Sequence, residues 1–136
     1  MLIRLLYISR ATGAITSTVT GSILESARVH NRVAGITGVL CQGQGLFIQI
    51  LEGERRMVNR LYNSITKDKR HQDVELVSIE EIQTRKFPNW SMAHVIISEN
   101  DPIVQLKHPD FDPFEASGQQ LEEIVDDLLK QSTPIH

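Results

Sequence analysis

The segment that most constrains the fold runs from residue 31 to residue 53, NRVAGITGVLCQGQGLFIQILEG. Two apolar runs flank a Gly-Gln-Gly turn at residues 43–45, a pattern typical of a β-hairpin. Side chains alternate along a strand, so Gln49 faces the same way as Phe47 and Leu51. Apolar residues on both faces predict a strand that is covered on both sides. Because an unpartnered buried amide costs about 1–3 kcal/mol, Gln49 needs a polar partner.

The composition describes an ordinary globular chain of 136 residues, long enough for one domain with a real core. The formal net charge of -3 gives no reason to expect nucleic acid or an anionic membrane as a partner. The N-terminal LIRLLYI is too short for a membrane span or a signal h-region. The single cysteine, Cys41, excludes an internal disulfide and favours a reducing compartment, so we expect a cytoplasmic protein.

Hydrophobic periodicity predicts strands at 2–8, 34–41, 46–52, 74–82 and 90–97, and helices at about 17–30 and 54–67. This order predicts an α+β fold, a ferredoxin-like β-α-β-β-α-β core with one additional strand and both helices on one sheet face. A last helix at about 118–130 follows a capping-box pattern at Ser117. Its apolar stripe should cap the other sheet face or pack on another subunit, and its residues are Leu121, Ile124, Val125, Leu128 and Leu129.

Motifs for hydrolytic chemistry are missing from the sequence. Gly43 to Gly45 lies in a hairpin turn and opens no helix, so it is not a phosphate loop. Cys41 lies in an apolar strand without a nearby His and is expected in the core. The histidines show no metal-ligand spacing; they are His30, His71, His94, His108 and His136. The absence of these motifs disfavours a hydrolytic enzyme.

Polar residues inside the apolar strands are the remaining candidates. The first and third strands are commonly neighbours in this fold, so Tyr7 and Gln49 are expected within hydrogen-bonding reach of each other. They form either a self-satisfying buried pair or part of a site. Position alone favours Asn31 as a helix C-cap over a ligand contact. Trp90 and Met92 are expected on one face of the last strand, as core residues.

Taken together, these residues resemble the BLUF family of blue-light sensors, which use flavin. The matching segments follow the family's order across residues 2–97, and they are Arg4–Arg10, His30–Asn31, Gly35–Gly38, Phe47–Gly53, Asp68–His71 and Phe87–Met92. The resemblance implies a flavin-binding domain at 1–98 and a C-terminal extension at 99–136.

The resemblance also implies a non-covalent FAD, with FMN or riboflavin as substitutes, held between the two helices. Tyr7 and Gln49 match the photoactive pair, and Asn31 matches the residue that binds the pyrimidine end of the ring. The other implied cofactor-binding residues are Ile23, Leu24 and Ile65 around the ring, Asp68, Arg70 and His71 near the ring or ribityl chain, Arg28 or Arg32 at the phosphates, His30 beside Asn31, and Met92.

The implied activity is sensing and not turnover. After blue light excites the flavin, Tyr7 donates an electron and a proton, and Gln49 rotates or changes tautomer. A stronger hydrogen bond to the flavin then shifts its absorption to the red. Trp90 and Met92 are expected to carry the change towards residues 99–116 and the last helix.

The sequence departs from the family pattern at Arg32, where a second polar amide is frequent, and it has no matching motif after about residue 98. We therefore expect a short sensor without its own catalytic domain, acting through a separate protein partner or through homo-oligomers. The alternatives are an acylphosphatase-like hydrolase, with Ser9–Gly13 as a faint anion loop, and a flavin-free module that oligomerises through the last helix.

Overall fold

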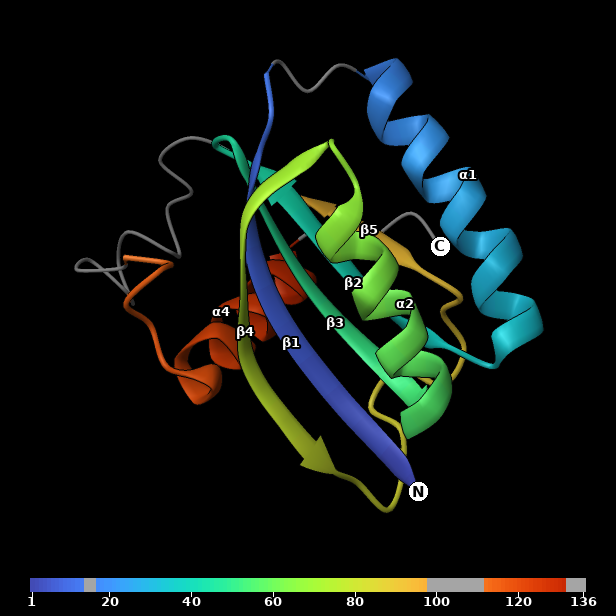
Figure 1. Cartoon of the computed structure of the whole chain (residues 1–136). Coiled ribbons are helices and arrows are strands. Elements are labelled where there is room, and N and C mark those ends of the chain that lie inside the picture. Colours follow the sequence, from blue (N-terminus) through green and yellow to red (C-terminus); the bar gives the residue numbers. More distant parts are fainter. Residues whose placement is uncertain (14–16, 98–111, 132–136) are drawn as a thin grey trace.

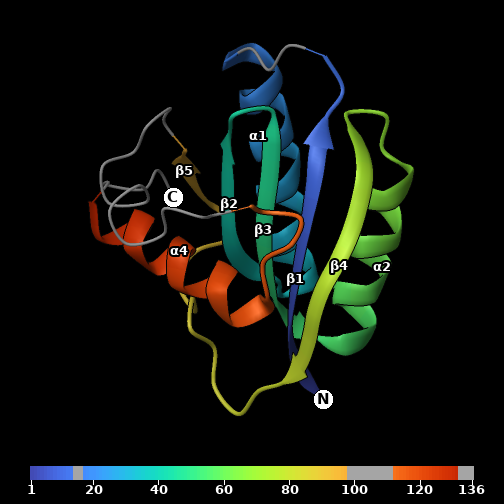
Figure 2. The same ribbon diagram turned by 90° about the vertical axis from the view of Figure 1, so that its left-hand side faces the viewer.

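A five-stranded sheet separates two layers of helices in the computed structural model, which describes residues 1–13, 17–97 and 112–131 (Figures 1 and 2). The strand order is β4-β1-β3-β2-β5, and every neighbouring pair is antiparallel except β2 and β5. The elements are β1 (Leu2–Ala11), α1 (Ser17–Ala34), β2 (Thr37–Gly43), β3 (Leu46–Glu54), α2 (Arg55–Lys67), β4 (His71–Glu81), β5 (Ala93–Ile96) and α4 (Gly118–Gln131). The predicted ferredoxin-like core with one added strand is confirmed.

The two sheet faces carry separate hydrophobic cores, as the alternation along β1 predicts. Leu5 and Tyr7 pack with residues of α1 and α2 on one face, whereas Leu6 and Ile8 pack with α4 on the other. β1 and β3 are neighbours, and Tyr7 lies directly opposite Gln49 in their ladder. The polar pair therefore lies in the centre of the sheet, under the layer formed by α1 and α2 (Figure 1).

Helix α4 covers the face of the sheet opposite α1 and α2 (Figure 2). Ser117 caps it, since its hydroxyl accepts a hydrogen bond from the Gln120 backbone N–H at 3.2 Å. The predicted stripe is buried in the core beneath it: Leu121, Ile124, Val125 and Leu128, with Leu129 at its margin. The apolar stripe thus packs on the protein's own sheet.

The hairpin turn between β2 and β3 has the conformation that its glycine content predicts. Gln44 and Gly45 both have positive φ, 56° and 73°, as a two-residue type I′ turn requires. This turn holds β2 and β3 in the register that places Leu40 opposite Gln49.

The first helix extends beyond its predicted end, which corrects the assignment of Asn31. Helix α1 runs to Ala34, and Gly35 ends it with a positive φ of 69°. The Ile36 N–H donates to the Asn31 backbone carbonyl at 2.9 Å, the long bond of a Schellman motif. The C-cap interpretation of Asn31 is wrong, because Gly35 supplies the left-handed residue and Asn31 lies inside the last turn.

The predicted last strand is shorter than its apolar pattern suggests, and this corrects a second assignment. β5 covers only Ala93–Ile96, so Trp90 and Met92 precede it and do not share a face. Trp90 packs in the core under α4, with its ring stacked on Phe87, while Met92 is buried in the core under α1 and α2. The Trp90 carbonyl accepts the Gly38 N–H, and the Ser91 and Met92 carbonyls accept from the Asn31 and Arg28 side chains of α1. Because the last two carbonyls bond to side chains, residues 91 and 92 do not continue the strand ladder of β5.

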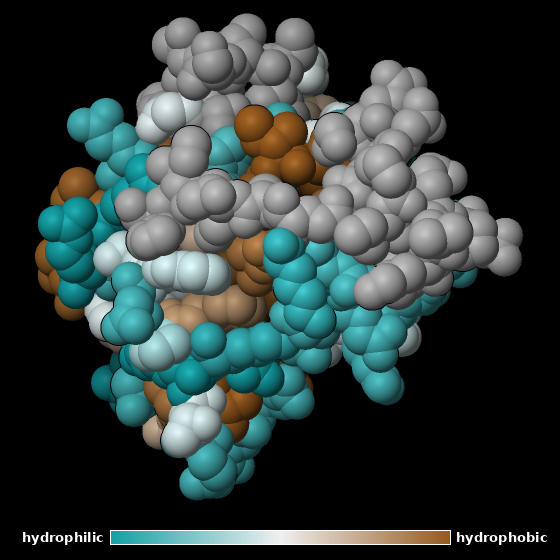
Figure 3. Space-filling view, turned by 180° about the vertical axis from the view of Figure 1, so that it is seen from behind, coloured by the Kyte–Doolittle hydropathy of each residue, from teal (hydrophilic) through white to brown (hydrophobic). Residues whose placement is uncertain are grey.

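Seen from behind, the surface of the described residues is mostly hydrophilic, with hydrophobic atoms in separate patches (Figure 3). Among the helices of the described ranges, none combines the length and hydrophobicity needed to span a membrane. The stretch at 99–116, where the signal was expected to travel, lies outside the described residues up to residue 111.

Candidate functional site

Three buried side chains, Tyr7, Gln49 and Met92, form a hydrogen-bonded row beneath α1 and α2. The Tyr7 hydroxyl donates to Gln49 Oε1 at 2.5 Å, and Gln49 Nε2 donates to the Met92 sulfur at 3.2 Å. Burial raises the pKa of Tyr7 far above its ordinary value, so the phenol is neutral and keeps its proton. The buried amide of the hairpin therefore has its polar partners within the protein.

The character of the two partners decides which way the Gln49 amide points. A thioether sulfur accepts hydrogen bonds weakly and donates none, so it favours the Nε2 end of the amide. The oxygen end is left for Tyr7, whose hydroxyl can donate. If the amide turned by half a rotation, its oxygen would face the Met92 sulfur without a donor between them. Gln49 therefore has one preferred orientation and one disfavoured alternative.

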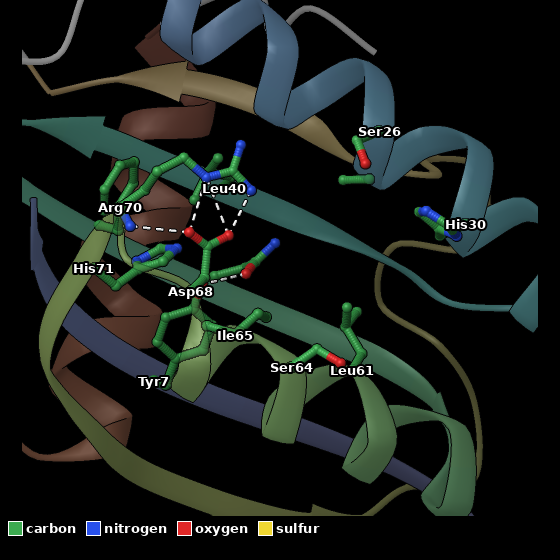
Figure 4. Close-up of a pocket in the computed structure, with 13 residues that line it drawn as sticks. Tyr7, Ser26, His30, Leu40, Leu61, Ser64, Ile65, Asp68, Arg70 and His71 are labelled. Carbon is green, nitrogen blue, oxygen red and sulfur yellow. Dashed lines mark hydrogen bonds and ion pairs between the residues drawn. The ribbon is translucent and has the colours of Figure 1, made fainter.

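A pocket opens between α1 and α2 above this row (Figure 4). Ser26 and His30 approach it from α1, and Ile65 lies on the opposite side on α2. Its lining is mixed, with apolar side walls and a polar end, and comprises Tyr7, Ser26, Ala27, His30, Leu40, Phe47, Gln49, Leu61, Ser64, Ile65, Asp68, Arg70 and His71. A second hollow continues along the same two helices and shares His30, Leu61 and Ser64 with the first. We call the two together the interhelical groove.

Asn31 lines the groove and carries an acceptor without a partner. Its side chain is buried, and Nδ2 donates to the Ser91 carbonyl at 2.8 Å. Its Oδ1 has no hydrogen-bond partner among the described residues. Because an unsatisfied buried oxygen costs about 1–3 kcal/mol, this atom suits a ligand that brings an N–H group.

One end of the groove is closed by an ion pair between Asp68 and Arg70. The Arg70 guanidinium and backbone N–H both donate to the Asp68 carboxylate, with Nε 2.9 Å from Oδ1 (Figure 4). The hydrogen bond from Arg70 lowers the pKa of Asp68, so the carboxylate stays charged. Arg70 is therefore held at the groove in a fixed orientation.

His71 lies between the groove and the sheet. Its Nδ1 is 2.8 Å from the buried Ser9 hydroxyl, and its ring lies 4.6 Å from the Phe47 ring. Burial lowers the pKa of His71, which favours the neutral imidazole. His71 also begins β4, so it is part of the sheet edge and not of a plain loop.

The remaining predicted residues are less close to the groove. Leu24 is buried in the core beside the groove. Arg28 donates from Nε to the Met92 carbonyl at 3.2 Å. Arg32 is exposed and lines neither hollow. Trp90 lies on the far side of the sheet. The side chain of Ile23 lies outside the described part of the chain.

Six residues of the first hollow were not singled out from the sequence, namely Ser26, Ala27, Leu40, Phe47, Leu61 and Ser64. The second hollow adds Val29, Val33, Ala34, Ile36, Met57 and Arg60. Helical spacing offered a signal for some of them, because Ala27 lies four residues before Asn31 and Leu61 four before Ile65. Among the described residues, no group of three or more His, Cys, Asp or Glu side chains could hold a metal ion.

A family model described as "Sensors of blue-light using FAD" matches residues 2–93. The chain belongs to the BLUF family. BLUF domains are sensor modules for blue light that use FAD, and residues 2–93 form a domain of this family.

Two curated BLUF relatives come from Euglena gracilis. The chain is 38% identical over 90 residues to the photoactivated adenylate cyclase subunit beta, covering 65% of the chain and 10% of the relative. It is 41% identical over 86 residues to the subunit alpha, covering 63% of the chain and 8% of the relative. The chain thus spans about a tenth of the length of these curated relatives.

Solved BLUF structures match nearly the whole chain. The photo-activated state of BlsA is 31% identical with a TM-score of 0.86, covering 100% of this chain and 99% of that one. The dark state of the BLUF protein BlrB is 30% identical with a TM-score of 0.79, covering 96% and 97%. A bacterial light-regulated adenylyl cyclase is 34% identical with a TM-score of 0.74, covering 93% of this chain and 36% of that one. The likeness therefore extends beyond the matched domain to the C-terminal helix.

Proposed function

We propose that the protein binds FAD non-covalently in the interhelical groove and that Tyr7, Gln49 and Met92 form its light switch. The observation that carries the proposal is the buried row in which Tyr7 donates to Gln49 and Gln49 donates to Met92. With the family shown, the hydrolase and the flavin-free module have no observation in their favour.

The donors and acceptors along the groove fit a flavin ring. Its N3–H is a donor that suits the unpartnered Oδ1 of Asn31, and its O2 and O4 suit N–H donors. The apolar sides of the ring suit the walls formed by Leu61 and Ile65. We assign the ribityl chain to the end held by Asp68 and Arg70.

FAD, FMN and riboflavin differ beyond the ribityl chain: FAD carries a diphosphate and adenosine, FMN a single phosphate, and riboflavin neither. Arg32 is exposed on α1, and we assign it to the phosphates because a guanidinium can bind them through two parallel hydrogen bonds. Arg28 is a weaker candidate, because its Nε is already bonded to the Met92 carbonyl.

When bound, flavin supplies the absorption of blue light and an acceptor for the electron of Tyr7. Tyr7 is protonated in the dark and can pass its proton along its hydrogen bond to Gln49 Oε1 once it has given up an electron. Gln49 then turns or changes tautomer, gives up its bond to the Met92 sulfur, and presents a different end to the groove. The bond to Met92 favours the dark orientation, so its loss is the first structural change outside the pair.

A change at Met92 can produce one of two signalling outputs, the binding of a separate protein partner or a change in homo-oligomerisation. Either output would take place in the cytoplasm. The segment at 90–92 is bonded to α1 through Asn31 and Arg28, so a shift there can reach the surface of the domain. Size-exclusion chromatography with light scattering, run in darkness and under blue light, tests the second output. A light-dependent mass supports it, and equal masses leave a separate partner as the output.

The cofactor proposal is tested by releasing the pigment of the purified protein and identifying it by chromatography. We expect FAD, with weaker retention in Asn31→Ala, because the variant loses the acceptor for N3–H. Glu25→Ala is the matched control, since Glu25 is exposed on the same helix and lines neither hollow of the groove. A colourless protein that ignores added FAD would refute the proposal, and full retention in Asn31→Ala would refute the role of Asn31.

A further inference from the structure

A fully buried carboxylate, Glu52, lies on the α4 side of β3 and is not among the residues of the groove. Its Oε1 accepts the backbone N–H of Phe87 at 2.7 Å, and its Oε2 accepts that of Lys86 at 3.0 Å. Arg4, opposite it on β1, approaches with Nε at 3.0 Å and Nη2 at 2.9 Å. These donors satisfy a charge that would otherwise be very costly to bury.

The same stretch of chain is held at a neighbouring residue. Arg85 Nη1 donates to Thr37 Oγ1 at 3.0 Å and to the Glu52 backbone carbonyl at 3.2 Å. Residues 85–87, which lead from β4 towards β5, are therefore clamped to β2 and β3, with Glu52 at the centre of the clamp.

This clamp lies close along the chain to the proposed switch. Met92 follows Phe87 by only five residues, a distance of at most about 18 Å of extended chain. The Phe87 and Trp90 rings stack with centroids 5.7 Å apart, and this contact restricts the conformations open to the chain between them. The position of Phe87 therefore limits where Met92 can lie.

The clamp is also connected to the helix on this side of the sheet. Arg4 lies 2.9 Å from Glu80 and 3.9 Å from Glu122 of α4. Lys86 donates to Asp126 of α4 at 2.8 Å. Glu52 therefore lies where the segment that carries Met92 meets α4.

We propose that Glu52 is a positioning residue for the light switch: by holding residues 86 and 87, it sets the contact between Met92 and Gln49 through the sheet. The inference rests on the proposed function of Gln49. Glu52 does not touch the groove, so it acts only through the chain that it holds. A weaker clamp lets Met92 withdraw from the Gln49 amide, which removes part of the preference for the dark orientation.

The test is the rate at which Glu52→Gln returns to the dark spectrum after blue light. The substitution keeps the side-chain shape, but its NH2 group must face one of several N–H donors, so at least one bond of the clamp is lost. We expect recovery to slow by roughly twofold to tenfold, the range that corresponds to one hydrogen bond. Glu80→Gln is the matched control, because Glu80 is bonded to Arg4 but not to residues 85–87, and it should recover at the wild-type rate.

A double substitution separates positioning from a merely structural effect. Met92→Leu keeps the volume but removes the sulfur acceptor, so adding Glu52→Gln to it should change recovery little further. An equal slowing in both backgrounds would overturn the inference. If Glu52→Gln does not fold, Arg85→Met loosens the same segment and carries the same expectation.

The two proposals fail in different ways. A wild-type protein without a photocycle overturns the proposed function. A wild-type photocycle with normal recovery in Glu52→Gln, or in Arg85→Met as its replacement, overturns only the role of Glu52.

Discussion

Gln49 is an amide between two partners of opposite hydrogen-bonding character, a donor hydroxyl on Tyr7 and a weak acceptor sulfur on Met92. An amide offers both functions, so it satisfies both partners in one orientation and only one of them in the other. This asymmetry suits a switch residue, because one amide orientation is stable in the dark and the other is reached only after light excitation. The same buried position filled by Leu would keep the shape and lose both states.

A second residue-scale consequence concerns His94 on β5. It is buried, with Nε2 3.3 Å from Gln42 Oε1, and burial together with the nearby charge of Arg28 lowers its pKa below the ordinary 6.5. The unfolded chain binds this proton more readily, so the free energy of unfolding should fall as the pH drops below about 6.5. His71 shifts in the same direction and adds to the effect.

Urea denaturation at about pH 7.5 and about pH 5.5 measures this dependence. His94→Gln should lose part of the fall in stability, up to the contribution of one proton, about 1.4 kcal/mol per pH unit. A fall of the same size in the variant would show that His94 is not its source.

At the scale of elements, periodicity predicted where the strands and helices lie but not all of their bounds. Besides α1 and β5, β1 runs to Ala11 and not to residue 8, β2 begins at Thr37 and not at 34, and β4 begins at His71 and not at 74. The pattern gave the order, the faces of β1 and the stripe of α4 correctly, because burial on one face leaves a clear alternation. It ended α1 too early, because Asn31 looks like a cap whereas the left-handed residue that ends the helix is Gly35. Tertiary context decides between the two.

The site was predictable to a similar extent. Tyr7 and Gln49 follow from alternation and from the usual pairing of the first and third strands, and their contact is present. The opposite directions of Trp90 and Met92 were not predictable, because an apolar run appears as a strand even where its carbonyls bond to side chains of a helix. Whether each predicted groove residue binds flavin stays a prediction, as does the division of the chain at residue 98.

Gly38 provides a test of the β2–β3 pairing that supports Gln49. A Cβ at this position would lie 1.9 Å from the Ile50 carbonyl oxygen, so Gly38→Ala must push the two strands apart. We expect a loss of about 1–3 kcal/mol in the free energy of unfolding, measured by urea denaturation. Gly21→Ala is the control, since a Cβ there meets nothing within 4 Å and should stabilise α1 by about 0.5–1 kcal/mol. Equal stability of the two variants would contradict the close approach.

At the scale of the whole molecule, one sheet serves two cores, a groove on one side and a helical cap on the other (Figure 2). The helix that the sequence left open to another subunit is packed on its own sheet. Because β3 contributes residues to both cores, a change at Gln49 and a change at α4 lie on opposite faces of the same strand.

The cap should therefore contribute to the stability of the whole domain. Leu121 is fully buried under α4, and Leu121→Ala should lower the free energy of unfolding by about 2–5 kcal/mol. Gln119→Ala, on the exposed side of the same helix, should change it by less than about 0.5 kcal/mol. Unfolding monitored by circular dichroism in urea compares the two, and a stable Leu121→Ala protein would mean that α4 is only loosely attached.

The light-minus-dark absorption spectrum of Gln49→Leu, compared with that of the wild-type protein, tests whether Gln49 is the light switch. We predict that both proteins are yellow and that only the wild type shows a reversible red shift under blue light, because Leu cannot bond to Tyr7 or to the flavin edge. A red shift of normal size in Gln49→Leu would show that Gln49 is not the switch.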